Sequence, residues 1–482
     1  MTSPPAVSHP VDLFKYQRAG VDALLKNDRL LLADDMGLGK TVQAVTALRT
    51  LAREGLCRRA LIVAPAGLIS QWRRELTRWA PDLSAIVVSG PQSDRGWQWR
   101  ADPTVTIVGY ETLRSDADAG PQAPPLRHVW DLVILDEAQK IKNRDVKVSS
   151  LVKNLRRARS WVLTGTPLEN KLDELASLLE FLDGREDGSH PLYTPSPRLL
   201  ERHAQVQLRR KKADVLPDLP PKLVTNLEIV LGRRQRRAYD RAEREGILEL
   251  RERGEELRIQ HVLELILRLK QLCNFEPISG KSAKLDDIRE RLITLTAQGH
   301  RALLFSQYID RTYGVQALAR SLSEFSPLTF TGDLDSGARD DVLNRFKSNP
   351  SHKILLLSLR AGGAGLNLQE ASYVFHMDRW WNPAVEHQAE DRSHRLGQMF
   401  PVTVFTYTCQ GTIEERIQEI LQSKQALFET FVDDVSLDVA STLRSEELFG
   451  LFGLRPPLIP PQGLPVSRRN PAAPPDRAHK SS

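Results

Sequence analysis

Two series of short apolar runs, separated by segments with helical patterning, constrain the fold of this chain most strongly. Runs that are apolar on both faces are typical of buried parallel strands. The pattern therefore predicts an α/β chain with two similar lobes, each built on a doubly wound parallel sheet. The first series comprises residues 30–33, 61–64, 85–88, 104–108, 132–135 and 161–163, and the second comprises residues 302–306, 328–330, 354–358, 373–377 and 402–406.

The segments between and after the two series differ in composition. A break rich in Pro, Gly and Asp precedes a strongly charged stretch at residues 201–270, which is mostly helical in pattern from residue 233 onward. The end of the chain is rich in proline and arginine and offers little to pack, so we expect disorder there. The expected units are a first lobe at 11–188, a basic helical insert and linker at 189–280, a second lobe at 281–440 and a disordered tail at 441–482.

The first apolar run leads into a glycine-containing loop that opens a helix. Backbone N–H groups and the helix dipole at such a position face bound phosphates. Lys40 would pair with the β- and γ-phosphates of ATP, and Thr41 would hold Mg²⁺. Asp34 stands where the common phosphate-loop pattern has glycine. The predicted nucleotide-binding residues are Asp35, Met36, Gly37, Leu38, Gly39, Lys40 and Thr41.

A second stretch, residues 388–395, carries arginines that would act on the same nucleotide. Within 382–397, Asn at the first position is an N-cap, the following Pro suits the first helical position, and Gly ends the helix. Spacings of four and three residues then place Gln388, Arg392 and Arg395 on one helix face. Paired guanidinium groups stabilise a transferring phosphoryl group, and such arginine fingers raise rates by roughly 10³–10⁵. We expect the second lobe to close these arginines onto ATP.

Two further motifs of the first lobe point to the same nucleotide. Asp136 and Glu137 follow the apolar run 132–135, and the carboxyl ends of parallel strands face the nucleotide crevice. Asp136 would hold Mg²⁺ through water, and Glu137 would orient or deprotonate the attacking water. Gln17 could read the adenine edge with its paired donor and acceptor.

Other segments are candidates for contact with nucleic acid. Thr164 and Thr166 leave a strand at a tight turn, where they could contact a phosphate backbone or relay the nucleotide state between the lobes. The loop 358–368 has three glycines that let a ligand approach the backbone closely. Two adjacent tryptophans beside a basic group could lie against DNA, although we expect at most one to touch it. These candidates are Lys142, Asn143, Thr164, Thr166, Arg360, Gly362, Gly363, Trp380 and Trp381, with Gly365 assigned to the nucleotide.

Charge and cysteine content narrow the classes of function. The 482 residues carry a net charge of +6, which hints at a polyanionic partner. The basic clusters at residues 209–212 and 233–237 are, like most charge runs, expected to be solvated faces, whereas 140–144 could contact phosphates. Three isolated cysteines exclude a disulfide framework and favour a reducing cytoplasm. No signal peptide is expected, and no apolar run approaches the ~18 residues of a membrane span.

Taken in order, these motifs resemble the Swi/Snf-type ATPases, the chromatin-remodeller-like branch of the second helicase superfamily. The resemblance covers about residues 12–420 and is most specific at 32–41, at 163–170 and at 378–398 with its Trp-Trp-Asn-Pro and Arg-Ser-His-Arg-Leu-Gly-Gln. Aspartate at position 34 is usual in this family. The resemblance implies two RecA-like lobes and ATP-driven, Mg²⁺-dependent tracking along double-stranded DNA without strand separation.

Some positions depart from that family. Gln139 stands where many relatives have histidine, and Ser358 where they often have threonine, so hydrogen-bonding capacity is kept. No segment resembles a bromodomain, chromodomain or zinc-binding module, which argues against histone recognition. The chain resembles a minimal bacterial or archaeal motor.

Three functions remain open at this stage. The first is a monomeric, cytoplasmic and nucleoid-associated translocase on double-stranded DNA, acting on an unidentified DNA-bound protein such as RNA polymerase or a repair or defence factor. The second is a strand-separating DNA or RNA helicase, which would need a wedge element that we do not identify. The third is an ATP-gated DNA-binding scaffold, against which Glu137, Arg392 and Arg395 argue.

Overall fold

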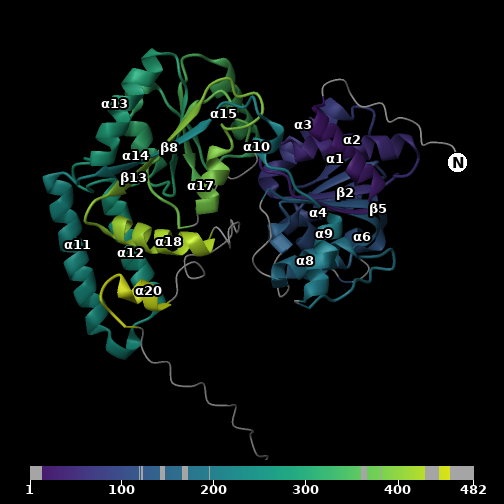
Figure 1. The fold of residues 1–482 in the computed structure, drawn as a ribbon, viewed down its shortest axis with the longest axis horizontal. Helices are drawn as coiled ribbons and strands as arrows, with labels where there is room; N and C mark the ends of the chain where they lie inside the picture. The colour runs from purple at the N-terminus through teal and green to yellow at the C-terminus, as the bar shows by residue number, and fades with distance from the viewer. Residues whose placement is uncertain are drawn as a thin grey trace, which may run out of the picture.

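The computed structural model describes residues 13–118, 120, 123–141, 147–165, 172–194, 196–359, 366–381, 383–428 and 445–455. These residues form two lobes that lie side by side (Figure 1). Each lobe contains one sheet, and every strand pairing recorded within these ranges is parallel. The predicted α/β class with two parallel-sheet lobes is therefore confirmed.

The first sheet has the strand order β3-β4-β2-β5-β6-β1-β7. Leu61 and Val63 pack in the core on one face, whereas Ile62 and Ala64 pack in the core on the other. Burial of both faces explains why this strand, residues 60–64, is apolar throughout. The strands are β1 (Arg29–Leu32), β2 (Ala60–Ala64), β3 (Ala85–Val88), β4 (Val105–Gly109), β5 (Val129–Asp136), β6 (Arg156–Leu163) and β7 (Gln207–Leu208).

Helices cover both faces of this sheet. Three helices, α1 (Lys15–Lys26), α2 (Lys40–Arg53) and α3 (Ile69–Trp79), contribute to the core on one face (Figure 1). The core on the other face includes residues of α5, α7, α8 and α9. The remaining helices of this lobe are α4 (Gln92–Arg100), α5 (Tyr110–Ala117), α6 (Pro124–Arg127), α7 (Lys147–Lys153), α8 (Leu172–Leu182) and α9 (Pro197–Val206), with the short 3₁₀ helices η1 (Ala66–Leu68) and η2 (Ala138–Ile141).

The second sheet has the order β10-β11-β9-β12-β13-β8. Helices α13 and α14 pack on one of its faces, and α15 and α17 pack on the other. The strands are β8 (Lys222–Ile229), β9 (Ala302–Ser306), β10 (Leu328–Phe330), β11 (Ile354–Ser358), β12 (Tyr373–His376) and β13 (Val402–Cys409). The helices are α13 (Ala283–Ala297), α14 (Val315–Ser321), α15 (Ser336–Ser348) and α17 (Pro383–Glu390), with η4 (Ser323–Phe325).

A helical unit extends from the second lobe. It consists of α11 (Arg233–Glu252), α12 (Ile259–Asn274), α18 (Ile413–Phe428) and α20 (Ser445–Gly450), with η3 (Gly254–Glu256) (Figure 1). Apolar residues of these helices share one core. Residues 445–455 fall within the tail that we expected to be disordered. They are ordered instead because Leu448, Phe449 and Phe452 are buried against the other helices of the unit. The rest of that tail lies outside the described residues.

The segment 189–280 is more than a helical insert. Helix α9 packs on the first lobe, and β7 adds an edge strand to the first sheet. After the short helix α10 (Lys212–Val215), strand β8 pairs with β13 and forms an edge of the second sheet. The segment thus contributes a strand to each lobe, which its charged composition does not indicate.

Two further features concern the cysteines and the apolarity of the helices. Cys57, Cys273 and Cys409 are free and buried. In the part of the chain that the structure describes, no helix combines the length and the apolarity that crossing a membrane requires.

Candidate functional site

The predicted phosphate loop connects β1 to α2. Gly37 (φ +87°) and Gly39 (φ +77°) adopt left-handed backbone conformations, which residues with a side chain rarely adopt. Helix α2 begins at Lys40, whose ammonium group donates to the backbone oxygen of Asp34 at 2.6 Å and to that of Asp35 at 3.4 Å. The lysine thus closes the loop onto itself, and burial lowers its pKa.

Gln17 lies beneath this loop. Its amide nitrogen donates to the backbone oxygen of Leu38 at 3.3 Å, and its amide oxygen accepts from the backbone N–H of Phe14 at 3.1 Å. Both ends of the amide are therefore engaged within the first lobe. Gln17 would have to exchange these partners to read an adenine edge, so that role stays a prediction.

Asp136 and Glu137 lie at the carboxyl end of β5. The indole N–H of Trp72 donates to the Asp136 carboxylate at 2.7 Å, and the Tyr110 hydroxyl donates to the Asp136 backbone oxygen at 2.9 Å. Burial and the neighbouring charge of Glu137 raise the pKa of Asp136 to about 7. Glu137 has a φ of +49°, an unfavourable conformation that is often found at functional sites. Trp72 and Tyr110 were missed by sequence reasoning because they come from distant elements.

One cavity of about 90 Å³ brings residues of both lobes together. Of the predicted site residues, it is lined by Met36, Gly37, Gly39, Lys40, Thr41, Asp136, Glu137, Arg392 and Arg395. The cavity walls also include Val42, Leu68, Gln71, Glu75 and Asp391, which the sequence did not single out. The structure does not place Gln17, Asp35, Leu38 or Gln388 in its lining. Gln388 is itself buried.

The arginines reach this cavity from turns and not from a helix face. Helix α17 ends at Glu390, so the prediction that Arg392 and Arg395 lie on that helix is wrong. Distant donors take the carbonyl groups of this segment: the N–H of Leu368 bonds the Arg392 oxygen at 3.0 Å, and Lys212 bonds the His394 oxygen at 2.8 Å. Within the segment, the N–H groups of Arg392 and Ser393 donate to carbonyl groups three residues back, which is the pattern of a turn and not of an α-helix.

The arginine side chains are desolvated and lie close to acidic groups. Burial lowers the pKa of Arg392 to about 10, against the opposing charge of Glu137, and it also lowers the pKa of Arg395. A Cβ atom added at Gly37 would lie 2.8 Å from the Cβ of Arg395. The phosphate loop and the arginine turns are thus in direct contact across the two lobes.

Most of the predicted nucleic-acid contacts lie outside the described residues. Lys142, Asn143, Thr166, Arg360, Gly362 and Gly363, and the predicted nucleotide contact Gly365, lie outside the described residues. Thr164 is buried, and a Cβ atom at the next residue, Gly165, would lie 2.4 Å from the Cγ of Met36. Of the two roles predicted for Thr164, this position beside the phosphate loop favours the relay between lobes over contact with DNA.

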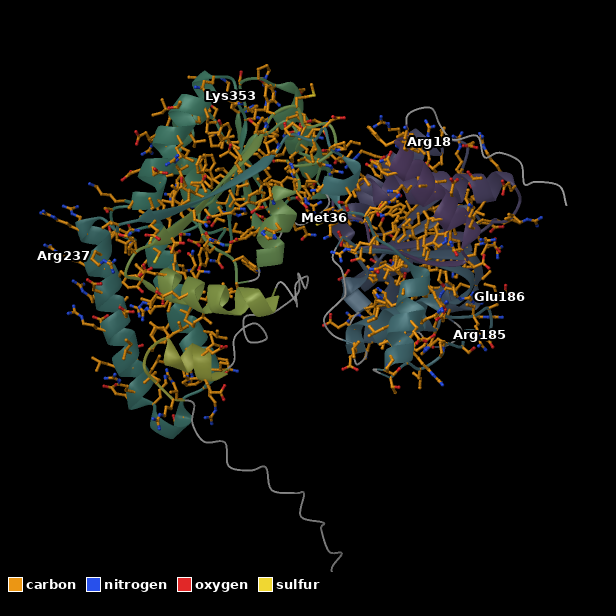
Figure 2. All side chains as sticks on the ribbon, viewed as in Figure 1. Arg18, Met36, Arg185, Glu186, Arg237 and Lys353 are labelled. Carbon is orange, nitrogen blue, oxygen red and sulfur yellow. The ribbon has the colours of Figure 1, made fainter. Side chains whose placement is uncertain are left out.

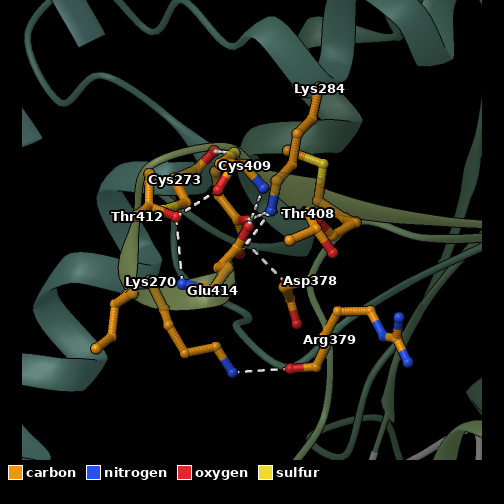
Figure 3. A network of polar contacts seen from close by, with 12 residues as sticks. Lys270, Cys273, Lys284, Asp378, Arg379, Thr408, Cys409, Thr412 and Glu414 are labelled. Carbon is orange, nitrogen blue, oxygen red and sulfur yellow. Dashed lines mark hydrogen bonds and ion pairs between the residues drawn. The ribbon is translucent and has the colours of Figure 1, made fainter. Parts of the chain in front are cut away.

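The two tryptophans differ in exposure. Trp381 is only 3% exposed and packs in the core of the helical unit, with its ring centroid 4.9 Å from the Lys270 ammonium group, so its burial does not favour the predicted contact with DNA. Trp380 is partly exposed. Lys270 also donates to the Arg379 backbone oxygen at 2.7 Å (Figure 3). Asp378 accepts from Asn274 at 2.9 Å. These bonds fix the backbone that carries the tryptophans.

Two cysteines and a glutamate gather in the same buried network. The potential ligand atoms of Cys273, Cys409 and Glu414 lie within 4.8 Å of one another. The Glu414 carboxylate, however, accepts from the Lys284 ammonium group at 2.7 Å and from the Cys409 backbone N–H at 3.0 Å (Figure 3). Because both carboxylate oxygens are engaged, we assign this cluster to the packing of the second lobe.

The basic cluster at residues 209–212 is not simply a solvated face. Arg210 forms an ion pair with the fully buried Asp34, and Lys212 forms one with Asp391 at 2.7 Å. The expectation for this cluster is therefore wrong at these two positions. By contrast, Arg237 of the second basic cluster is exposed and projects from the outer side of α11 (Figure 2). Figure 2 also shows Met36 of the phosphate loop, which lies where the first lobe faces the second.

Comparison with known proteins identifies the family of this chain. The SNF2-related domain profile matches residues 16–277, and the helicase conserved C-terminal domain profile matches residues 283–397. YwqA of Bacillus subtilis, provisionally named an ATP-dependent helicase/translocase, is 34% identical over 90% of this chain and 50% of its own length. The uncharacterized ATP-dependent helicase MG018 of Mycoplasma genitalium is 31% identical over 92% of this chain and 44% of its own length.

The chain spans about half the length of these curated relatives. Among solved structures, the Sulfolobus solfataricus SWI2/SNF2 ATPase core in complex with dsDNA is similar at a TM-score of 0.41 and 28% identity, covering 92% of this chain and 97% of that one. The family assignment rests on the profiles, because the first matches more than half of the 482 residues and the second follows it directly. The chain belongs to the SNF2-related domain family.

Proposed function

We propose that this chain is a DNA-dependent ATPase that moves along double-stranded DNA and remodels or displaces bound proteins without separating the strands. The observation that carries the proposal is the single cavity to which Lys40 and Glu137 contribute from one lobe and Arg392 and Arg395 from the other. Hydrolysis at such a site depends on how the lobes are aligned. Alignment of the lobes by DNA would therefore couple ATP turnover to DNA binding.

Each group in the cavity has a role in phosphoryl transfer. The loop N–H groups and Lys40 would bind the phosphates, with Lys40 exchanging its backbone acceptors for phosphate oxygens. Glu137 would orient the attacking water, and the two guanidinium groups would stabilise charge that develops on the γ-phosphoryl group. The cavity has a volume of about 90 Å³, whereas ligand pockets typically have volumes of about 300–1,000 Å³. Nucleotide entry therefore requires the phosphate loop and the arginine turns to move apart.

The donor set suits a magnesium ion. Asp136 and Glu137 place two carboxyl groups next to each other, and Asp136 is buried, so the raised pKa of Asp136 reflects the cost of negative charge there. Thr41 and Asp136 would hold the ion together with phosphate oxygens. When bound, Mg²⁺ would neutralise charge on the phosphates.

We propose that DNA binding is directed at phosphates and independent of base sequence. The candidate contacts are basic side chains and glycine-rich loops rather than a helix that reads a groove. Affinity should then fall steeply with salt, and Lys142→Ala or Arg360→Ala should each flatten the slope of log K against log salt by about one unit. An unchanged slope would indicate that the replaced residue lies on the solvated surface and makes no phosphate contact.

A single chain supplies both halves of the cavity, so we propose that a monomer is sufficient for turnover. A motor of this kind would act in the cytoplasm, associated with the nucleoid. Its target would be a DNA-bound protein, such as RNA polymerase or a repair or defence factor. Copurification with endogenous partners would identify that target.

Steady-state ATPase assays with duplex DNA, single-stranded DNA and RNA test the proposal. We expect slow hydrolysis alone and much faster hydrolysis with duplex DNA. The chain should also displace the third strand of a triplex and leave a forked duplex paired. Equal rates with all three nucleic acids would refute the translocase. Efficient unwinding of the fork would indicate a strand-separating helicase, and DNA binding without turnover would indicate an ATP-gated scaffold.

A further inference from the structure

The segment of residues 208–222, which connects the lobes, runs directly beside the phosphate loop. The backbone oxygen of Leu208 accepts from the N–H of Ala33 at 2.8 Å, and that of Arg210 accepts from the N–H of Asp35 at 3.0 Å. The N–H of Lys212 in turn donates to the Asp35 carboxylate at 2.9 Å. The segment therefore continues the parallel pairing of β1 and β7 into the loop itself.

Side-chain contacts of Arg210 strengthen this attachment. Its guanidinium group donates to the Asp34 carboxylate, with an Nε to Oδ1 distance of 2.9 Å, and to the Gln43 amide oxygen at 2.8 Å. Asp34 is fully buried. Removing one partner of a buried ion pair leaves an uncompensated charge, so this end of the segment is firmly held.

The Lys212 side chain extends to the opposite lobe. Its ammonium group pairs with the Asp391 carboxylate at 2.7 Å and donates to the His394 backbone oxygen at 2.8 Å. Asp391 directly precedes Arg392, and His394 directly precedes Arg395. One partly buried ammonium group thus holds the residues before both arginines.

Two further contacts attach the far end of the segment to the same turns. Lys222 pairs with the Glu390 carboxylate at 2.7 Å, and the His394 ring contacts the Pro220 backbone oxygen at 2.8 Å. Residues 390–394 are therefore held from both ends of the segment. A displacement of the phosphate loop can reach the arginine turns through these bonds.

We propose that residues 208–222 form an interlobe tether and that Lys212 is a positioning residue, which sets the place of Arg392 and Arg395 relative to ATP on the phosphate loop. The inference rests on the proposed ATPase function and adds the element that couples the loop to the arginines. Lys212 does not line the cavity, so its loss should impair the alignment of the arginines more than the binding of nucleotide. The relative position of the two lobes should also depend on Lys212 when no ATP is hydrolysed, because the tether connects the lobes in the absence of nucleotide.

Kinetics of matched variants test the positioning role. Lys212→Met keeps most of the side-chain volume and removes the charge, and the exposed neighbour Lys211→Met is the control. We expect Lys212→Met to lower DNA-stimulated kcat by roughly 10- to 100-fold, the scale of misplaced catalytic groups, with a much smaller change in KM for ATP. Lys212→Arg should recover part of the loss, because a guanidinium group can serve both acceptors. A Lys212→Met variant with wild-type kcat would overturn the inference.

Distance measurements test the tether independently of hydrolysis. Spin labels at Ser93→Cys and Gln298→Cys, which are exposed positions on different lobes, would report the interlobe distance, since the native cysteines are buried. Lys212→Met should broaden the distance distribution without nucleotide, and Lys211→Met should not. An unchanged distribution would overturn the tether. If Lys212→Met does not fold, Lys222→Met, which also removes a tether contact, undergoes the same test.

The two proposals fail in different ways. A chain that hydrolyses no ATP would refute the proposed function, and the distance distributions would still decide the tether. A DNA-stimulated ATPase that is insensitive to Lys212→Met would refute the positioning role of Lys212 and leave the proposed function standing.

Discussion

Replacing Arg395 by alanine should abolish most ATP turnover and leave the fold almost intact. Among the contacts that the structure describes, this side chain donates one hydrogen bond, to the Leu366 backbone oxygen at 3.2 Å. A neutral acceptor of this kind contributes about 1 kcal/mol net to stability. A finger that accelerates phosphoryl transfer by roughly 10³ stabilises the transition state by about 4 kcal/mol. The catalytic loss should therefore greatly exceed the loss of stability.

Three measurements separate these effects. DNA-stimulated kcat should fall by roughly 10³, whereas the affinities for nucleotide and for duplex DNA, measured in separate binding assays, should change far less. Thermal unfolding should shift by only a few degrees. The exposed Arg237, replaced by alanine, is the control for loss of a positive charge (Figure 2).

A second arginine provides an internal check. Arg392→Ala should behave like Arg395→Ala, because both side chains line the same cavity. The double variant should lose less than the product of the two single losses, since both groups act on one phosphoryl group. Near-normal DNA-stimulated hydrolysis in Arg395→Ala would refute the closure of the second lobe onto ATP.

Three other predictions concern the phosphate site and the buried ion pair of the second lobe. Lys40→Ala should weaken ATP binding. Glu137→Gln should still bind ATP but fail to hydrolyse it, and the variant should stay bound to DNA. Normal ATP turnover by Glu137→Gln would disprove the role of Glu137 in orienting water. Because the pKa of Asp136 is raised to about 7, its carboxyl group is mostly protonated at about pH 6 and mostly ionised at about pH 8. The affinity for Mg²⁺, measured calorimetrically, should therefore rise from about pH 6 to about pH 8. An affinity that does not change with pH would contradict the assignment of Asp136 as a ligand. Lys284→Met leaves the buried Glu414 without its cation and should destabilise the second lobe by about 3–5 kcal/mol, as measured by hydrogen exchange. Adding Glu414→Leu to Lys284→Met should restore most of that loss, because no charge is then left unpaired. Additive effects of the two substitutions would argue against a buried pair.

Much of the fold could be predicted from local sequence. The runs 302–306 and 354–358 coincide with β9 and β11, in which every residue is buried, because strands that are buried on both faces must be apolar throughout. The apolar runs 85–88 and 328–330 also coincide with strands, the edge strands β3 and β10. Strand β8 was missed because it is an edge strand whose residues are mostly exposed, so burial imposed no continuous apolar run on it. The phosphate loop and the acidic pair were likewise recognisable, since their chemistry lies within a few consecutive residues.

The sequence by itself determined the two parallel-sheet lobes and which side chains are suited to phosphate chemistry. Only the tertiary structure decided that Arg392 and Arg395 leave the helix, since the donors that bond their segment come from distant residues such as Lys212. It also decided that Trp72 contacts Asp136 and that Trp381 is buried. These outcomes depend on contacts between residues far apart in the chain, whereas hydrophobic periodicity and motif spacing report only on neighbours along it.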